Sequence, residues 1–319
     1  MAIKDKMKNN MTNIKTKIKH FLQKINFFQN TLLINHLVSK FEYITRKEYL
    51  SSCALNSKES GISDTKYCDN EIIVSLTTFD KRLYEVYLTI ESIMQQTYKP
   101  NRIVLWLSEE IKDNKLPLFL LNQIKRGLEV RYCKDTKSYK KLIPSLKAFP
   151  SATIITIDDD ELYFYDLLEN IINEHKQYPR YILCTRMHYI KLKMNKKPAK
   201  YVKWQKALNS CEISPLNFAT GCGGVLYPAN CFNEEVLKEE IFFDICKYAD
   251  DIWFKAISLL NNVPVKKVFT HTKNSMDYYP NIQDSDSRLV RINIDNGMND
   301  IQLKAVFDKY NLYEKLLKK

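Results

Sequence analysis

The stretch Ser151-Ala-Thr-Ile-Ile-Thr-Ile-Asp-Asp-Asp-Glu161 joins a short apolar run to four consecutive acidic residues. The β-branched run from Thr153 to Ile157 predicts a strand that is buried on both faces. In open α/β sheets, ligands bind beyond the carboxyl ends of the strands. Carboxylate oxygens suit a hard divalent cation such as Mg²⁺ or Mn²⁺. The acidic run therefore predicts either a metal site that holds a phosphorylated ligand, or a cap for a helix beginning near Leu162.

Segments with strand and helix periodicity alternate on both sides of this stretch. Strands are expected at residues 72–76, 103–107, 129–133, 153–157, 181–184 and 265–269. Helices are expected at residues 83–95, 116–126, 139–149, 162–176, 234–239, 251–260 and 299–319. This alternation predicts an α/β fold with a mixed, mostly parallel sheet flanked by helices. Residues 186–217 are basic and aromatic and fit no firm pattern.

The composition is that of an ordinary globular protein, with 319 residues, 45% apolar and 27% charged. The net charge is +12, and residues 1–60 contribute +7 of it, from eleven Lys/Arg and four Asp/Glu. Since the basic character is concentrated there, no nucleic-acid partner is expected for the rest of the chain. The eight cysteines form no C-x-x-C pair or zinc pattern, and no signal or spanning segment is visible. We therefore expect a cytoplasmic protein with reduced thiols.

Residues 1–60 are predicted to form a basic helical extension and linker, with the linker at residues 51–70, and residues 61–319 to form the main domain. Apolar residues between Ile14 and Phe41 recur at helical spacing beside several lysines. A basic amphipathic helix can lie peripherally on an anionic membrane surface. It can equally pack against its own domain or a partner, and the sequence leaves these alternatives open.

Two motifs that follow expected strands carry groups able to meet a phosphorylated ligand. The loop after the first strand holds Thr77, Thr78 and Arg82, whose hydroxyls and guanidinium could contact a nucleotide. Lys140 belongs to a Ser-Tyr-Lys-Lys motif after the third strand and could counter phosphate charge. A solvated loop and a surface charge pair are the structural alternatives for these two motifs.

A glycine-rich turn, Thr220-Gly-Cys-Gly-Gly224, contains three of the six glycines of the protein. Glycine permits positive φ and close approach of the backbone, so Gly223 and Gly224 could lie under a sugar. The turn matches neither the Walker nor the dinucleotide-binding pattern. A tight turn between two strands explains it equally well.

A second carboxylate pair, Asp250 and Asp251, opens an expected helix. A carboxylate at a helix N-terminus that faces a cleft can take a proton from a hydroxyl. Alternatively, Asp250 caps the helix. His271 follows a late strand and could complete a metal shell, although a single histidine is more often an ordinary structural residue.

Seven motifs occur in order along the chain: Val74-Ser-Leu-Thr-Thr, Leu105-Trp-Leu-Ser108, Ser138-Tyr-Lys-Lys-Leu142, Ile157-Asp-Asp-Asp160, Thr220-Gly-Cys-Gly-Gly-Val-Leu-Tyr-Pro228, Ala249-Asp-Asp-Ile-Trp253 and Asn299-Asp-Ile-Gln-Leu303. Together they resemble bacterial glycosyltransferases of the GT-A fold, near the family 2 type, that build surface polysaccharides. The resemblance covers about residues 71–319 and does not include residues 1–60. The order of the motifs is much more specific than any one of them.

The resemblance implies a nucleotide-sugar donor and a divalent metal, Mn²⁺ or Mg²⁺, held by Asp158 and Asp160, with His271 as the candidate further ligand. Because the run reads Asp-Asp-Asp-Glu, the choice of ligating acids is open. Asp251 matches the general base of inverting members, with Asp250 beside it. The other residues implied in donor or acceptor binding are Thr77, Thr78, Arg82, Lys140, Asp159, Gly223 and Gly224.

The implied reaction moves a sugar to a hydroxyl of a glycan or lipid-linked acceptor, with inversion, at the cytoplasmic face of the inner membrane. Two alternatives remain. A sugar nucleotidyltransferase uses the same kind of sheet, but it usually has a glycine-rich basic loop after the first strand, and residues 77–82 lack glycine. A non-catalytic basic binding module is disfavoured for the main domain by the uneven charge.

Overall fold

The structure is a computed structural model that describes residues 34, 37–206, 210–268, 278–279, 293 and 297–318. The chain divides into two compact units, Met1–Glu48 and Tyr49–Lys319. Residues 37–56 are helical. The linker expected at residues 51–70 therefore starts too early, because residues 51–56 still belong to this helix. Most of the helix expected from Ile14 lies outside the described residues.

A seven-stranded sheet with the order β10-β6-β9-β4-β1-β2-β3 forms the centre of the second unit. Its strands are β1 (Ile72–Thr77), β2 (Arg102–Ser108), β3 (Leu128–Cys133), β4 (Thr153–Thr156), β6 (Ile182–Cys184), β9 (Val225–Tyr227) and β10 (Val265–Lys267). Neighbours pair in parallel except at β9, which is antiparallel to β4 and β6. The predicted α/β class with a mostly parallel sheet is confirmed. The chain order reverses at β1, which has β2 on one side and β4 on the other.

Two short sheets lie outside the central one. One pairs β5 (Leu162–Tyr163) with β11 (Tyr278–Tyr279), and the other pairs β7 (Met187–Tyr189) with β8 (Asn217–Ala219). The second sheet and a short helix, η4 (Tyr201–Lys203), organise the segment that the sequence left unassigned.

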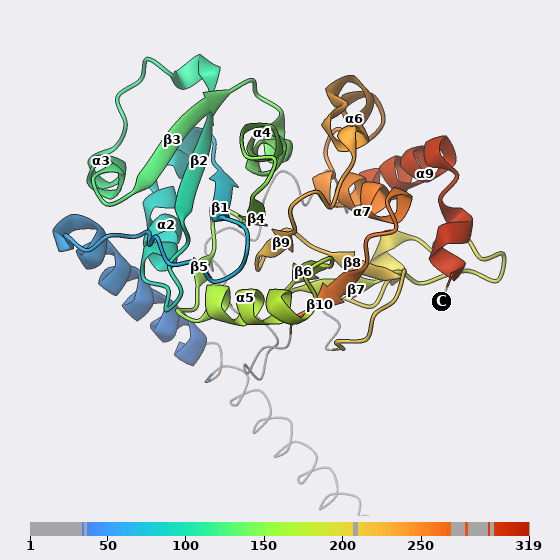
Figure 1. The fold of residues 1–319 in the computed structure, drawn as a ribbon, viewed down its shortest axis with the longest axis horizontal. Coiled ribbons are helices and arrows are strands. Elements are labelled where there is room, and N and C mark those ends of the chain that lie inside the picture. The colour runs from blue at the N-terminus through green and yellow to red at the C-terminus, as the bar shows by residue number, and fades with distance from the viewer. Residues whose placement is uncertain are drawn as a thin grey trace, which may run out of the picture. The chain divides into compact units, whose positions relative to one another are not determined.

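Helices flank the central sheet (Figure 1). The α-helices are α2 (Val86–Met94), α3 (Leu118–Ile124), α4 (Ile143–Ala148), α5 (Leu167–Gln177), α6 (Glu239–Ile245), α7 (Asp250–Leu260) and α9 (Met298–Tyr310). The other 3₁₀ helices are η1 (Asp80–Tyr84), η2 (Glu109–Ile111), η3 (Lys137–Lys141), η5 (Glu234–Leu237) and η7 (Tyr313–Leu317). The single C-terminal helix expected at residues 299–319 is instead broken, since Asn311 adopts a left-handed φ of 50° between α9 and η7.

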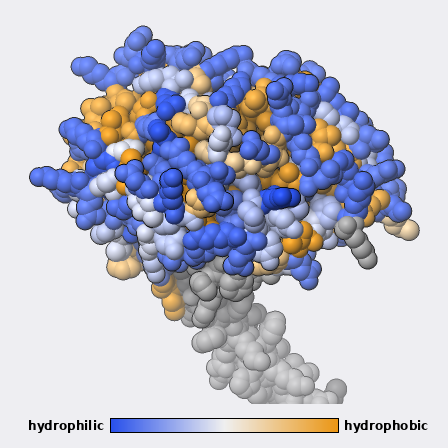
Figure 2. All heavy atoms as spheres, viewed as in Figure 1, coloured by the Kyte–Doolittle hydropathy of each residue, from blue (hydrophilic) through white to orange (hydrophobic). Residues whose placement is uncertain are grey.

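The central strands are buried on both faces because their alternate side chains enter two different cores. Ile154 and Tyr227 pack in the cluster that includes residues of α6, α7 and α9. Their neighbours Ile155 and Leu226 pack in the cluster that includes residues of α2 and α5. On the face seen in Figure 2, hydrophilic side chains dominate and apolar patches interrupt them. The eight cysteines are all free thiols.

The chain after the acidic run does not begin a helix at Leu162, as the sequence predicted. It continues as strand β5, and α5 starts at Leu167. Contacts with α2 explain the extended path. The Thr89 hydroxyl donates to the carbonyls of Asp159 and Glu161 at 3.0 and 2.9 Å, and the Tyr163 amide donates to Ser92 Oγ at 3.1 Å. The acidic run therefore does not cap a helix, and the capping interpretation is wrong.

The expected helix at residues 139–149 is divided into η3 and α4. The break falls at Leu142. Pro144 does not interrupt the chain further, because it lies in the first turn of α4, where its missing N–H costs no helical hydrogen bond. The last turn of η3 thereby presents Lys140 and Lys141 in succession.

A buried ion pair ties α2 to the chain that follows α3. Glu91 is fully buried, and its two oxygens accept hydrogen bonds from the Arg126 guanidinium at 2.8 and 2.9 Å. Gln123 donates to the same carboxylate at 3.0 Å. Two charges buried at this depth are tolerated only because they satisfy each other.

Candidate active site

The candidate site lies where the chain order of the sheet reverses. Ser75 of β1 pairs with Thr156 of β4, so the carboxyl ends of these strands are neighbours. The loop after β1 carries Thr78 and Arg82, and the chain after β4 carries the acidic run. Such a reversal is where open α/β sheets bind ligands, because the loops separate there and leave a crevice.

Asp159 joins the two loops. Its carboxylate accepts hydrogen bonds from Thr78 Oγ1 at 2.5 Å and from the Arg82 guanidinium at 2.8 Å. Burial raises the pKa of Asp159, and Arg82 opposes that shift. With only 7% of its side chain exposed, Asp159 shapes the loops and offers little surface to a ligand. The structure thus brings together the predicted residues Thr78, Arg82 and Asp159.

Asp158 and Asp160, on either side of Asp159, are each 30% exposed at the side chain. Asp160 pairs with Arg82 at 2.9 Å. Burial, followed by the charge of Asp158, raises the pKa of Asp160 to about 6. Like charges are therefore crowded at the two accessible carboxylates, and a bound cation would relieve this repulsion.

Lys141 connects the acidic run to the second carboxylate pair. Its Nζ lies 2.9 Å from Asp158 Oδ1 and 3.2 Å from Asp250 Oδ2. Burial alone would lower the pKa of Lys141, but these two carboxylates raise it well above its usual value. The backbone of Lys141 is fixed as well, since the Ser75 hydroxyl of β1 donates to its carbonyl at 2.6 Å.

Lys140, the lysine chosen from the sequence, is not in this cluster. It pairs with Asp135 at 2.6 Å. The Ser-Tyr-Lys-Lys motif showed that a lysine would follow the third strand, but the direction of each side chain depends on η3. The Thr77 hydroxyl donates to the Trp106 carbonyl of β2 at 2.8 Å.

Asp250 and Asp251 open α7, as expected. Ala249 occupies the N-cap position and no side chain caps the helix, so the capping role considered for Asp250 is not observed. Asp251 Oδ2 accepts a hydrogen bond from the Gly221 amide at 3.1 Å. Burial, followed by the charge of Asp250, raises the pKa of Asp251 to about 7. A carboxylate with such a pKa can act as a general base near neutral pH.

The glycine-rich turn contributes through Gly221 more directly than through the glycines chosen from the sequence. A side chain at Gly221 would collide with the Lys141 ammonium and lie 3.2 Å from Asp251 Oδ1. Gly223 and Gly224 adopt φ of 96° and 100°, which turn the chain into β9. A side chain at Gly224 would meet Ile171 in the core and not the carboxylates.

Two residues of the unassigned segment, Arg186 and Tyr201, also lie at this edge, although no sequence motif predicted them. The Arg186 guanidinium donates hydrogen bonds to Thr220 Oγ1 and Cys222 Sγ, both at 3.1 Å, and so stabilises the glycine-rich turn. Tyr201 is near enough to Asp251 for that charge to add to burial in raising the tyrosine pKa. Only the basic and aromatic composition of residues 186–217 could have pointed to them.

Asp158 and Asp160 are the side chains best placed to hold a metal ion. Among the residues that the structure describes, no three metal-ligating side chains come together. His271 lies outside the described residues. A two-carboxylate set nevertheless fits Mg²⁺ or Mn²⁺, because such ions are often held by one or two carboxylates together with substrate phosphates. The carboxylates of Asp158–Asp160 and Asp250–Asp251 outnumber the cations Arg82 and Lys141. This surplus of negative charge also favours binding of a divalent cation.

No protein-family model and no curated protein matches the sequence. Among solved structures, the chain is similar to S. aureus TarS 1-349, with 15% identity and a TM-score of 0.41 over 65% of this chain and 59% of that one. It is also similar to the mannosyltransferase PcManGT from Pyrobaculum calidifontis in complex with GDP-Man and Mn²⁺, with 13% identity and a TM-score of 0.46 over 86% and 72% of the chains. The inositol-1-phosphate CTP transferase from T. maritima is 16% identical, with a TM-score of 0.37 over 63% and 85%. A shared activity does not follow at these levels, and the function proposed below depends on the site.

Proposed function

We propose that the protein is a metal-dependent glycosyltransferase that moves a sugar from a nucleotide-diphosphate sugar to a hydroxyl of a glycan or lipid-linked acceptor. The observation that carries the proposal is the meeting of Asp158, Lys141 and Asp251 at the reversal of the sheet. Two accessible carboxylates for a cation, beside the half-buried Asp251 carboxylate with a pKa of about 7, supply the two functions that this transfer needs.

In the proposed reaction, the bond between the anomeric carbon and the diphosphate oxygen breaks, and the acceptor oxygen bonds to that carbon. Asp251 takes the proton of the acceptor hydroxyl. The Gly221 amide holds Asp251 in place through its hydrogen bond. A base on the face opposite the leaving group gives inversion at the anomeric carbon. When bound, the metal at Asp158 and Asp160 would neutralise the departing diphosphate.

Lys141 and Arg82 have a positioning role in this proposal. Each pairs with a carboxylate of the acidic run, so the run can gather acidic side chains without unfolding the loops. Arg82 also lies in η1, shortly after β1, where its guanidinium could reach a phosphate. The order of the motifs along the chain supports a role in bacterial surface-polysaccharide synthesis.

Metal dependence is tested with Asp160→Ala. Loss of this ligand is expected to lower transfer by about a hundredfold or more, since a metal can supply several kcal/mol of charge stabilisation. Transfer is measured with Mn²⁺ and with EDTA, and wild-type activity is expected to vanish in EDTA and to return with Mn²⁺. The matched control is Asp113→Ala, which replaces an exposed aspartate that is distant in sequence from the acidic run. Full wild-type activity in EDTA would contradict the proposed metal dependence.

We further propose that the N-terminal unit contacts the cytoplasmic face of the inner membrane. Leu37, Phe41 and Ile44 recur at helical spacing and are 55%, 71% and 46% exposed. The residues before them are rich in lysine, which favours an anionic lipid surface. No helix in the described part of the chain is long and apolar enough to cross a bilayer. A peripheral contact through this apolar stripe agrees with these features.

The membrane contact is tested with Leu37→Glu/Phe41→Glu in the full chain. Sedimentation with phosphatidylserine vesicles is expected to fall, because two charges are placed in the apolar stripe. An exposed lysine-to-glutamate pair elsewhere, Lys112→Glu/Lys125→Glu, makes the net charge more negative and serves as the control. Equal sedimentation of the stripe variant and the wild type would favour packing on the protein or on a partner instead.

A further inference from the structure

The segment from Arg186 to Cys211 contains eight basic residues and no acidic one. It contributes +8, which exceeds the +5 of residues 61–319 as a whole, so the rest of that region is acidic overall. The lysines from Lys191 to Lys206 are all exposed. Such a concentration of like charge attracts an anionic ligand.

A cavity of about 440 Å³ opens in this segment. One part of its wall is Tyr189 and the three residues that follow β7. Another part is Lys203 at the end of η4 and the two residues after it, and Leu216, just before β8, also lines the cavity. Backbone hydrogen bonds fix these walls, since Tyr189 and Gln205 exchange two of them, at 2.9 and 3.2 Å, and the Ile190 amide donates to the Leu216 carbonyl at 2.9 Å. The volume is within the range of small-molecule sites, about 300–1,000 Å³.

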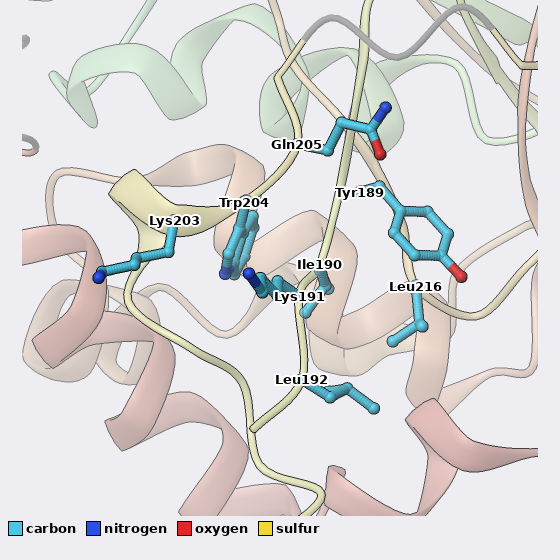
Figure 3. A pocket seen from close by; sticks show the side chains of 8 residues that line it. All are labelled: Tyr189, Ile190, Lys191, Leu192, Lys203, Trp204, Gln205 and Leu216. Carbon is cyan, nitrogen blue, oxygen red and sulfur yellow. The ribbon is translucent and has the colours of Figure 1, made fainter. Parts of the chain in front are cut away.

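The lining combines cations, an amide and aromatic rings. Figure 3 shows Trp204 between Lys203 and Lys191, with Tyr189 and Leu216 across from them. No acidic residue is among the eight that line the cavity. Two ammonium groups near the half-buried Tyr189 ring, which offers an apolar face, suit a ligand that has both a negative charge and a C–H surface.

An aromatic contact leads from the cavity toward the candidate active site. Trp204 packs on Tyr201 with the ring centroids 4.8 Å apart. The Tyr201 phenol in turn is under the influence of the Asp251 charge. Trp204 is held in place, because its indole N–H donates to the Ala199 carbonyl at 2.9 Å. A ligand in the cavity would therefore lie beside Trp204, whose ring contacts Tyr201.

We propose that this cavity binds an anionic saccharide unit, carrying a carboxylate or a phosphate, of the acceptor glycan. Lys191 and Lys203 pair with the negative group, and Tyr189 supports the face of the sugar ring. The inference depends on the proposed function for the identity of the ligand as an acceptor. It predicts that this acceptor carries a negative charge. It also assigns a role to the lysine-rich part of the segment from Arg186 to Cys211, which takes no part in the proposed reaction.

The shape of the site favours a saccharide over two other anions. A single-stranded nucleic acid binds through exposed aromatic faces along a groove, whereas Trp204 is 4% exposed and packs internally. An anionic bilayer is flat, whereas the two lysines border a hollow. Met194 and Val202 are exposed on the same segment, however, so vesicles are included among the probes.

The test measures binding to the full-length protein by calorimetry, without donor. The saccharide probes are a galacturonic acid hexamer and maltohexaose, a neutral hexamer, and phosphatidylserine vesicles and poly(U) are tested beside them. The acidic hexamer is expected to bind and the neutral one to bind at least about tenfold more weakly, as expected for the loss of charge-assisted hydrogen bonds. The variant Lys191→Glu/Lys203→Glu is expected to weaken binding of the acidic hexamer by a similar factor or more.

The matched control is Lys112→Glu/Lys125→Glu, which makes the same change of net charge at exposed lysines outside this segment. It is expected to keep the wild-type affinity within about twofold. Equal binding of both hexamers, or equal losses in the two variants, would overturn the proposal. So would binding of phosphatidylserine vesicles or poly(U) that depends on Lys191 and Lys203 while the acidic hexamer fails to bind. The binding test contains no donor, so its result does not depend on catalysis. Failure of the proposed transfer reaction would be seen in the separate activity assay, as a lack of donor cleavage.

Discussion

Replacing Asp251 with Asn is expected to lower sugar transfer by about 10²–10⁴-fold, the range that general-base assistance supplies. The amide has the shape of the carboxylate and can still accept the hydrogen bond from Gly221, but it cannot take a proton from the acceptor. The measurement is kcat with saturating donor and acceptor. Asp244→Asn, which changes an exposed aspartate of α6, is the matched control and is expected to retain wild-type kcat.

The pH dependence gives this prediction a second readout. Asp251 acts as a base only when it is deprotonated, and its pKa is raised to about 7. Wild-type kcat is therefore expected to rise with pH through an acidic limb centred near 7, and the residual activity of Asp251→Asn is expected to lack that limb. A wild-type profile that is flat between about pH 5.5 and 8.5 would contradict the role of Asp251.

Loss of activity in Asp251→Asn should not reflect unfolding. Folding raises the pKa of Asp251 above its ordinary value of 3.8, so ionisation of this group disfavours the native state. The resulting penalty is absent at low pH, grows as the pH rises above the unfolded value and is complete above about 7. Because Asn carries no charge, the variant is expected to be at least as stable as the wild type at pH 8.

Replacing Arg126 with Met is expected to destabilise the fold by about 3–5 kcal/mol, because it leaves Glu91 charged, buried and without its main partner. The free energy of unfolding is measured by urea titration. Lys304→Met is the matched control, since it breaks an ion pair of α9 whose lysine is 74% exposed, and a small change is expected. The double variant Glu91→Leu/Arg126→Met removes both charges and is expected to be more stable than Arg126→Met alone. Equal stability of Arg126→Met and the wild type would contradict the buried-pair interpretation.

The architecture was largely predictable from the sequence, because buried parallel strands give short apolar runs that local periodicity detects. The segment after the acidic run was not. A helix was expected from Leu162, but contacts with α2, through Thr89 and Ser92, hold the chain extended until Leu167. Such a tertiary contact overrides local propensity and leaves no pattern in the segment itself.

The candidate site was predictable in its motifs and less so in its individual side chains. The acidic run, Asp251 and the glycine-rich turn do meet at one edge of the sheet. The choice between Lys140 and Lys141 depends on the rotation of η3, and adjacent residues of a helix point in different directions. The contribution of Arg186 depends on β7 and β8, which pair over a long separation in the chain. Neither feature can be inferred from spacing alone.

The most direct test of the central claim is the identity of the product released from nucleotide sugars. Purified protein is incubated with a panel of donors and Mn²⁺, with and without EDTA, and the products are separated by chromatography. A glycosyltransferase site releases a nucleoside diphosphate, in a reaction that EDTA stops and Asp251→Asn slows. Formation of pyrophosphate from a nucleoside triphosphate and a sugar phosphate, with no nucleoside diphosphate from any donor, would contradict the account.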